Sequence, residues 1–298
     1  MDPEGAQEWS ERVELSSGTD GIRRGDDTKG KQYEGKTMAD YYFRTQKMCV
    51  GYDGRPLIRD MEISLEKGEI LSLIGPNGAG KSTVLKSIAG QLRLLGGTVY
   101  LGDELLSGMR MKDLAKRMSV VFTDKVRAEL KSCRDVVATG RYPYTGRLGI
   151  LSGEDERIVD EVMELTHMSD IGDRDFDRVS DGQRQRVMLA RAICQEPDIV
   201  VLDEPTSWLD IRYKLEFLSL LQEMRDRRGL TVIMSLHELE LARIVSDKIL
   251  CLKGEYVERF GAPEEIFRSD FIEKLFGIDE RNFADNPKFL TYIRGMEQ

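Results

Sequence analysis

The sequence is poor in cysteine and lacks any long hydrophobic run. Its 298 residues include 4 cysteines, and their scattered positions fit neither a zinc site nor a disulfide framework. No run approaches the roughly 18 apolar residues that a membrane-spanning helix needs. The polar first residues, MDPEGAQEWSERVELSSGTDG, lack the apolar core of a signal peptide. We therefore expect a soluble, cytoplasmic protein that meets a membrane only through a partner.

Basic residues are not in excess either. The 44 Lys and Arg against 53 Asp and Glu give a formal net charge of −9, so no overall field attracts nucleic acid, and we expect no nucleic-acid partner. Hydrophobic residues at 40% and charged residues at 33% are ordinary for a folded protein with a sizeable core. The absence of an internal repeat favours one functional unit over a tandem pair.

The composition divides the chain into three parts. Residues 1–38 have few aliphatic side chains and many polar ones, which predicts a disordered tail. Residues 39–276 form the predicted domain, and residues 277–298 a C-terminal extension with a weak pattern. Within the domain, residues 41–52 and 57–69 alternate between apolar and polar side chains, as strands of an antiparallel sheet do.

Short apolar runs predict a second sheet and an α/β fold. They are apolar on both faces, as in a parallel sheet that helices cover on either side. The runs are residues 69–75, 118–122, 198–203, 230–236 and 248–253.

Helical patterns separate these strands. Residues 81–90 form a predicted helix that Gly90 ends. Residues 210–227 form another, with one apolar stripe made of Ile211, Leu215, Leu218 and Leu221. Residues 125–178 have no convincing strand and predict a helical insert, which includes a helix over 153–165.

The segment GPNGAGKST, residues 75–83, predicts a phosphate-binding loop. Gly75, Gly80, Lys81 and Ser82 match the pattern G-x-x-x-x-G-K-[ST], in which glycines let backbone N–H groups point at phosphate oxygens. The helix that follows adds the positive end of its dipole. Lys81 would contact the β- and γ-phosphates and Ser82 would ligate Mg²⁺. A chance glycine-rich turn of this pattern has roughly a one per cent probability in such a chain. The expected nucleotide-binding residues are Gly75, Pro76, Asn77, Gly78, Ala79, Gly80, Lys81, Ser82 and Thr83.

Two carboxylates follow the apolar run IVVL. Asp203 and Glu204 fall at the carboxyl end of a predicted strand, the edge where open α/β sheets hold ligands. Asp203 is suited to hold Mg²⁺ through water, and Glu204 to orient and deprotonate an attacking water as the catalytic base. The alternative for Glu204 is a solvated acid at a strand end.

The segment VSDGQRQRV, residues 179–187, has the features of a second anion site. Ser180 is a good helix N-cap, and Gly182 exposes its backbone N–H. A helix cap without any ligand is the alternative interpretation.

The order of these motifs, with a helical insert before the Ser180 helix, resembles that of the ATP-binding cassette (ABC) ATPases, from about residue 40 onward. This resemblance implies a P-loop NTPase fold with a RecA-like core, an antiparallel β subdomain and an α-helical subdomain. It implies ATP and Mg²⁺ as ligands. It also implies that the Ser180 helix closes over the nucleotide of a second copy, so that two copies pair head to tail.

The resemblance assigns roles to further residues. Tyr52 matches the aromatic residue that stacks on adenine, although a strand-end tyrosine is the simpler interpretation. His237 matches the catalytic histidine that contacts the γ-phosphate. Asp210 matches the loop that links the two active sites, and Gln183 belongs to the signature with Ser180 and Gly182. His167, the other histidine, is interpreted as structural.

Three positions depart from the family pattern. Asp181 replaces the first glycine of the signature, and a carboxylate is unfavourable beside phosphate unless it points away or meets an arginine. Thr123, followed by Asp124, stands where the family has a glutamine that reaches Mg²⁺ and the attacking water. Trp208 stands where a small residue or histidine is common, and the sequence offers no functional account of it.

The resemblance implies the ATP-hydrolysing subunit of an importer, peripheral on the inner face of the cell membrane. Its partners would be transmembrane permease subunits and, through them, a substrate-binding protein. The segment ATGRYPYTGRLG, residues 138–149, resembles the corresponding stretch in importers of iron–siderophore, haem and cobalamin. The alternative is a soluble non-transport ABC ATPase, such as a cluster-assembly subunit. A kinase or GTPase is set aside, because the sequence has no Asn-Lys-x-Asp motif.

Overall fold

The computed structural model describes residues 41–122, 131–146, 148–207, 209–268, 271–278 and 295. These residues belong to one unit, which begins at residue 38. Thr123, Asp124 and Trp208 lie outside the described residues, as do the tail expected at the N-terminus and most of the C-terminal extension.

The central sheet has the strand order β11-β10-β4-β9-β8-β7 in the described part of the chain. It is parallel except for β11, which pairs antiparallel with β10. The apolar runs in the sequence predict five of these strands, but β11, which has no buried residue, gives no such signal. The strands are β4 (Ile70–Ile74), β7 (Met118–Val121), β8 (Ile199–Leu202), β9 (Thr231–Ser235), β10 (Lys248–Lys253) and β11 (Tyr256–Gly261).

An antiparallel sheet of order β2-β1-β5-β6 covers part of the central sheet. The short strand β3 pairs with the first residues of β1, Phe43 and Arg44. The two stretches expected to form antiparallel strands do so. The sequence pattern misses β5, which begins with two glycines, a residue depleted in strands. The strands are β1 (Phe43–Tyr52), β2 (Arg55–Met61), β3 (Ser64–Leu65), β5 (Gly96–Leu101) and β6 (Glu104–Leu105).

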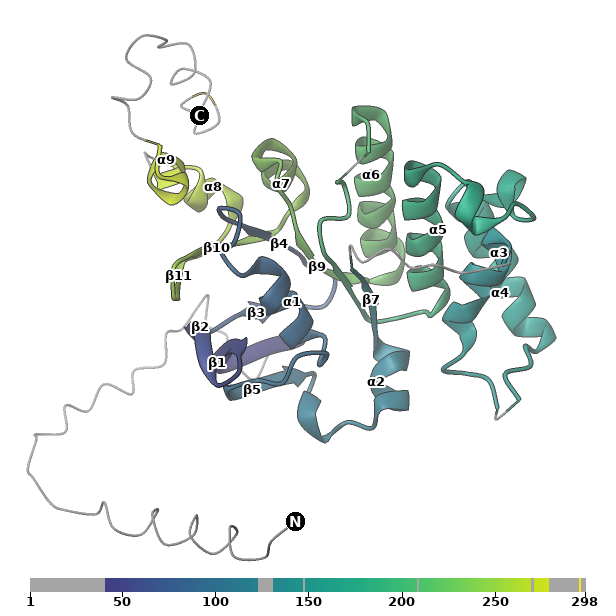
Figure 1. Cartoon of the computed structure of the whole chain (residues 1–298), viewed down its shortest axis with the longest axis horizontal. Helices are drawn as coiled ribbons and strands as arrows, with labels where there is room; N and C mark the ends of the chain where they lie inside the picture. The colour runs from purple at the N-terminus through teal and green to yellow at the C-terminus, as the bar shows by residue number, and fades with distance from the viewer. Residues whose placement is uncertain are drawn as a thin grey trace, which may run out of the picture. The chain divides into compact units, whose positions relative to one another are not determined.

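Helices lie on both faces of the central sheet. Figure 1 shows α1 between the two sheets, while α3, α4 and α5 pack together on the side of the molecule beyond β7. The helices are α1 (Lys81–Ile88), α2 (Met111–Arg117), α3 (Cys133–Ala138), α4 (Gly153–Leu165), α5 (Asp181–Cys194), α6 (Ile211–Arg228), α7 (Leu239–Val245), α8 (Pro263–Ile266) and α9 (Phe271–Phe276). Short 3₁₀ turns are η3 (Leu106–Gly108), η4 (Thr139–Arg141), η5 (Ser169–Ile171) and η6 (Phe176–Arg178).

Successive residues of a central strand enter two different cores. In β4, Ile70 and Ile74 join a cluster with α3 to α9, whereas Leu71 and Leu73 join one with α1 and the antiparallel sheet. The strands are therefore buried on both faces, as their continuous apolar runs predict. The fold is the expected one, with a parallel core sheet, an antiparallel β subdomain and helices.

One expectation about α6 is wrong. Ile211 and Leu215 are 66% and 51% exposed, whereas Leu218 and Leu221 are buried. The buried face instead consists of Phe217, Leu218, Leu221 and Met224. The helical period is correct, but the first two turns of α6 leave this stripe exposed, and burial begins at Phe217.

The described part of the helical insert carries α3, α4 and 3₁₀ turns, with one isolated β-bridge between Ser132 and Asp175. The helix α4 has the predicted bounds, because Ser152 and Asp155 form a capping box at its start. Among the described residues, no helix combines the length and hydrophobicity needed to cross a bilayer.

Candidate nucleotide-binding site

The phosphate loop lies between β4 and α1, and its conformation requires glycine. Gly75 and Gly80 have φ values of 150° and 92°, which L side chains rarely adopt. A Cβ added at Gly75 would lie 2.2 Å from the carbonyl oxygen of Leu252 in β10. At Gly80 it would lie 2.8 Å from Cδ2 of Leu57. The phosphate loop therefore packs tightly against Leu252 and Leu57. A glycine-rich turn of this kind exposes backbone N–H groups.

Lys81 lies inside this loop. Its Nζ donates to the carbonyl oxygens of Gly75 (2.8 Å) and Pro76 (3.2 Å), and the residue is 6% exposed. Burial lowers the pKa of Lys81, while the charges of Glu204 and Asp203 oppose that shift. Because an ammonium group has three N–H donors, one is left for a phosphate oxygen.

The acid pair lies at the end of β8, as predicted, and Ser235 holds both members. The Ser235 hydroxyl donates to Oδ1 of the buried Asp203 (2.7 Å) and accepts from the backbone N–H of Glu204 (2.8 Å). The sequence analysis missed Ser235, although a polar residue ending the apolar run of β9 is a signal for such a role.

Glu204 and His237 contact each other, with 2.6 Å between Oε1 and Nε2. Ser207 donates to the other carboxylate oxygen of Glu204 (3.3 Å). Glu204 has a φ of 48°, so its backbone is strained and points the side chain in a fixed direction.

A cavity of about 410 Å³ brings most of these groups together. The sequence analysis did not single out Leu57, because an apolar strand residue carries no functional signal. The cavity is lined by Leu57, Asn77, Gly78, Ala79, Gly80, Lys81, Ser82, Thr83, Glu204 and His237.

Tyr52 lies at the edge of this site. Its hydroxyl is 3.2 Å from Oγ1 of Thr83, and the side chain is about half exposed at the end of β1. An aromatic face therefore lies next to the end of the phosphate loop, free to contact a planar ligand.

The signature residues do not line this cavity. Ser180 caps α5, and its side chain forms a capping box with Gln183 (3.1 and 3.3 Å). Asp210 caps α6 and accepts from the backbone N–H of Tyr213 (3.0 Å). The described residues that line the phosphate-loop cavity do not include Ser180, Gly182, Gln183 or Asp210. The predicted role of Thr123 falls on a residue outside the described part.

Asp181 is the exposed first residue of α5, where its charge complements the helix dipole. Neither nearby arginine pairs with it. Arg184 lies over the ring of Phe176, and Arg186 pairs with Glu216 of α6.

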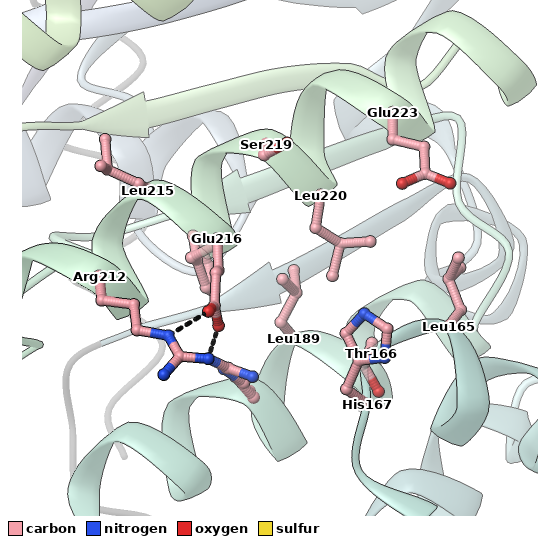
Figure 2. A pocket seen from close by; sticks show the side chains of 12 residues that line it. Leu165, Thr166, His167, Leu189, Arg212, Leu215, Glu216, Ser219, Leu220 and Glu223 are labelled. Atoms are coloured by element: carbon pink, nitrogen blue, oxygen red, sulfur yellow. Dashed lines mark hydrogen bonds and ion pairs between the residues drawn. The ribbon is translucent and has the colours of Figure 1, made fainter.

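A larger cavity, about 620 Å³, lies between α5 and α6 and shares no lining residue with the phosphate-loop cavity. Figure 2 shows leucine side chains along it, His167 and Glu223 at one end, and the ion pair of Arg212 with Glu216 at the other. Size alone does not identify the nucleotide site; the glycine loop with Lys81, Glu204 and His237 does.

Comparison with known proteins shows the family of this chain. The family model described as "ABC transporter" matches residues 58–207. The iron(3+)-hydroxamate import ATP-binding protein FhuC of Bacillus subtilis is 36% identical, over 83% of this chain and 94% of that protein. The chain thus belongs to the ABC transporter family, as an ATP-binding subunit. It binds ATP, and its ATPase activity is coupled to transport.

Two solved structures resemble it. One is a transporter described as of the metal-chelate type, in an inward-facing conformation, with 25% identity and a TM-score of 0.71 over 80% of this chain and 89% of that chain. The other is an ATP-binding cassette in a dimeric post-hydrolysis state with ADP and Pi. It has 25% identity and a TM-score of 0.65, over 74% of this chain and 98% of that chain.

Proposed function

We propose that this chain is the ATPase subunit of an importer of iron chelates, acting as a head-to-tail pair on a membrane permease. The observation that carries the enzymatic part is the single cavity shared by the glycine loop, Lys81, Glu204 and His237. A triphosphate bound there would lie next to Lys81, which stabilises charge, and next to Glu204, which acts as the general base. His237 holds that base in place.

Ser82, which lines the cavity, and the buried Asp203 next to Glu204 also fit Mg²⁺. The hydroxyl of Ser82 and the carboxylate of Asp203, the latter through water, are oxygen ligands of the kind that Mg²⁺ prefers. Asp203 is buried beside Ser235, so its position is fixed. When bound, Mg²⁺ would neutralise charge on the phosphate oxygens.

Hydrolysis then depends on Glu204. Its carboxylate orients a water and accepts its proton as the water oxygen bonds to the γ-phosphorus and the bond to the β-phosphate oxygen breaks. His237 holds the carboxylate from the other side, and Lys81 stabilises the charge on the phosphates.

A second copy is needed to complete the site. Ser180, Gly182 and Gln183 form a helix N-terminus suited to phosphate but lie away from their own phosphate loop. The similar cassette seen as a dimer supports pairing in which each Ser180 helix covers the partner's nucleotide. Tyr52 would stack on adenine, and Asp210 would contact the facing subunit.

The importer assignment and the substrate class are supported by the named relatives. FhuC is a protein of iron(3+)-hydroxamate import, and the similar transporter is of the metal-chelate type. The segment of residues 138–149 agrees with them. The chain would work at the inner face of the membrane, with permease subunits that receive cargo from a substrate-binding protein.

The change Glu204→Gln tests the enzymatic role. Loss of the general base is expected to lower ATP turnover by at least about 100-fold, with ATP affinity retained because the phosphate loop is unchanged. Turnover and equilibrium binding of a fluorescent ATP analogue are measured on the same preparation. Hydrolysis at the wild-type rate in this variant would remove Glu204 from the mechanism.

A further inference from the structure

The residue after His237 ties its loop to two other elements. Glu238 accepts a hydrogen bond from Thr206 (3.1 Å), in the loop after β8, and pairs with Lys214 on α6. The side chains of Glu238 and Lys214 are only 32% and 20% exposed, so solvent screens this ion pair less than a pair on the surface. Burial would raise the pKa of Glu238, but the hydrogen bond from Lys214 and its other partners hold that pKa below its usual value.

The same part of α6 is tied to the signature helix on its other side. Arg186 of α5 pairs with Glu216, and its guanidinium carbon lies 4.5 Å from the centre of the Tyr213 ring. The Arg186 side chain is 12% exposed. Glu216 also accepts from Arg212 (2.8 Å), and Figure 2 shows these two residues at one end of the larger cavity.

Direct packing accompanies these ion pairs. A Cβ added at Gly182 of the signature would lie 3.5 Å from Leu209 and 3.8 Å from Tyr213. The first two turns of α6, residues 211–217, therefore contact the start of α5 and are joined to the His237 loop through Lys214.

We propose that Lys214 and Arg186 are positioning residues that make the first two turns of α6 a rigid link between the His237 loop and the signature helix. The inference rests on the proposed pairing, in which His237 serves its own subunit's nucleotide and Ser180 serves the partner's. A displacement at one nucleotide is then transmitted through α6 to the other.

The change Lys214→Met tests the link at the His237 loop. It is expected to lower kcat about tenfold and to leave the KM for ATP within about twofold, because the phosphate loop is untouched. Lys214→Arg keeps the charge and is expected to recover most of the rate. The matched control is Arg227→Met, because Arg227 pairs with Glu223 (3.0 Å) on the same helix and touches neither partner element. If Lys214→Met folds poorly, Glu238→Gln removes the same charge pair with a side chain of equal size.

A double-mutant cycle with Arg186→Met tests whether α6 joins the two sites. Lys214 and Arg186 have different partners, and Arg186→Met is also expected to lower kcat/KM about tenfold, so independent effects would multiply to about 100-fold. If α6 is a rigid link, the double variant should lose only about 10- to 20-fold in kcat/KM. The Hill coefficient for ATP should also fall toward 1 in each single variant. Multiplicative losses with unchanged cooperativity would overturn the inference.

Failure of the inference differs from failure of the proposed function. If the wild-type protein hydrolyses ATP cooperatively but Lys214→Met behaves like Arg227→Met, only the link is wrong. If the wild-type protein shows no cooperativity and Glu204→Gln still hydrolyses ATP, the proposed function itself is wrong.

Discussion

At the scale of single residues, the backbone and the side chain of Glu204 are both held in place, although an acid that follows a strand is commonly free in solvent. Its backbone has a φ of 48°, a conformation that costs roughly 1 kcal/mol or more. Its N–H donates to Ser235, and its carboxylate contacts His237 and Ser207. Strain and hydrogen bonds together fix one direction of the side chain, as the proposed role of Glu204 as a base that meets one water requires.

Tyr52 gives a prediction at this scale. Tyr52→Ala removes the aromatic face and is expected to weaken ATP binding about tenfold, because stacking on a base contributes about 1–3 kcal/mol. Tyr52→Phe keeps the face and loses only the hydroxyl contact with Thr83, so its affinity should stay within about threefold of wild type. Binding of ATP and of tripolyphosphate is compared by calorimetry. Equal weakening for both ligands would show that Tyr52 does not contact the base.

The sequence predicts the chemically distinctive site residues and misses the ordinary ones. Gly75, Lys81 and Glu204 are recognisable because their spacing is rare and each has a defined chemical role. Ser235 and Leu57 are common residues in strands, and only their neighbours in space show that they belong to the site. No pattern along the chain carries that information.

At the scale of elements, the start of α4 depends on a buried charge. Asp155 is 7% exposed, closes the capping box with Ser152 and pairs with the buried Arg141 (2.9 Å). Arg141 also pairs with Glu196 (2.8 Å) and donates to the carbonyl of Cys194, which joins α4 to the end of α5. Arg141 thus has a structural role in holding α4 to the end of α5.

Asp155→Ala is expected to lower the free energy of unfolding by about 2 kcal/mol at pH 7, because it leaves the buried Arg141 with one carboxylate partner, Glu196, and removes a helix cap. Hydrogen bonds from Ser152, with the Arg141 charge, hold the pKa of Asp155 below its usual value. The folded state therefore binds fewer protons than the unfolded one, so the stabilisation is present above pH about 4 and is lost as the pH falls further.

Urea unfolding at pH 7 and pH 3 measures this effect. The difference between wild type and Asp155→Ala should shrink at the lower pH. A control is Asp113→Ala, which removes an exposed acid that pairs only with Arg110 on the surface. A loss that is the same at both pH values would contradict the assigned charge pair.

Helices and strands with a clear hydrophobic pattern can be predicted from the sequence. Those whose burial or pairing depends on neighbouring elements cannot. The strands β4, β8, β9 and β10 are continuous apolar runs, and α4 has both a capping box and an apolar stripe. The strand β11 has no buried residue, so its pairing with β10 leaves no periodic signal. In α6 the period is visible, but where burial begins depends on which residues cover it.

At the scale of the whole molecule, the proposed function gives one chain two incomplete nucleotide-binding surfaces. The phosphate loop with its acid pair is one, and the start of α5 with the Asp210 turn is the other. The exposed Ile211 lies directly after Asp210, so the second surface includes apolar area open to a partner. Pairing of two copies accounts for both surfaces with one arrangement.

Sedimentation of Glu204→Gln with and without MgATP tests this arrangement most directly. The variant is expected to sediment as a single chain without nucleotide and as a pair with saturating MgATP, since slow hydrolysis leaves the nucleotide in place. Adding Ser180→Arg, which places a large side chain at the start of α5, should abolish pairing while ATP still binds. A variant that stays single with MgATP bound, or that pairs equally well with Ser180→Arg, would contradict the account.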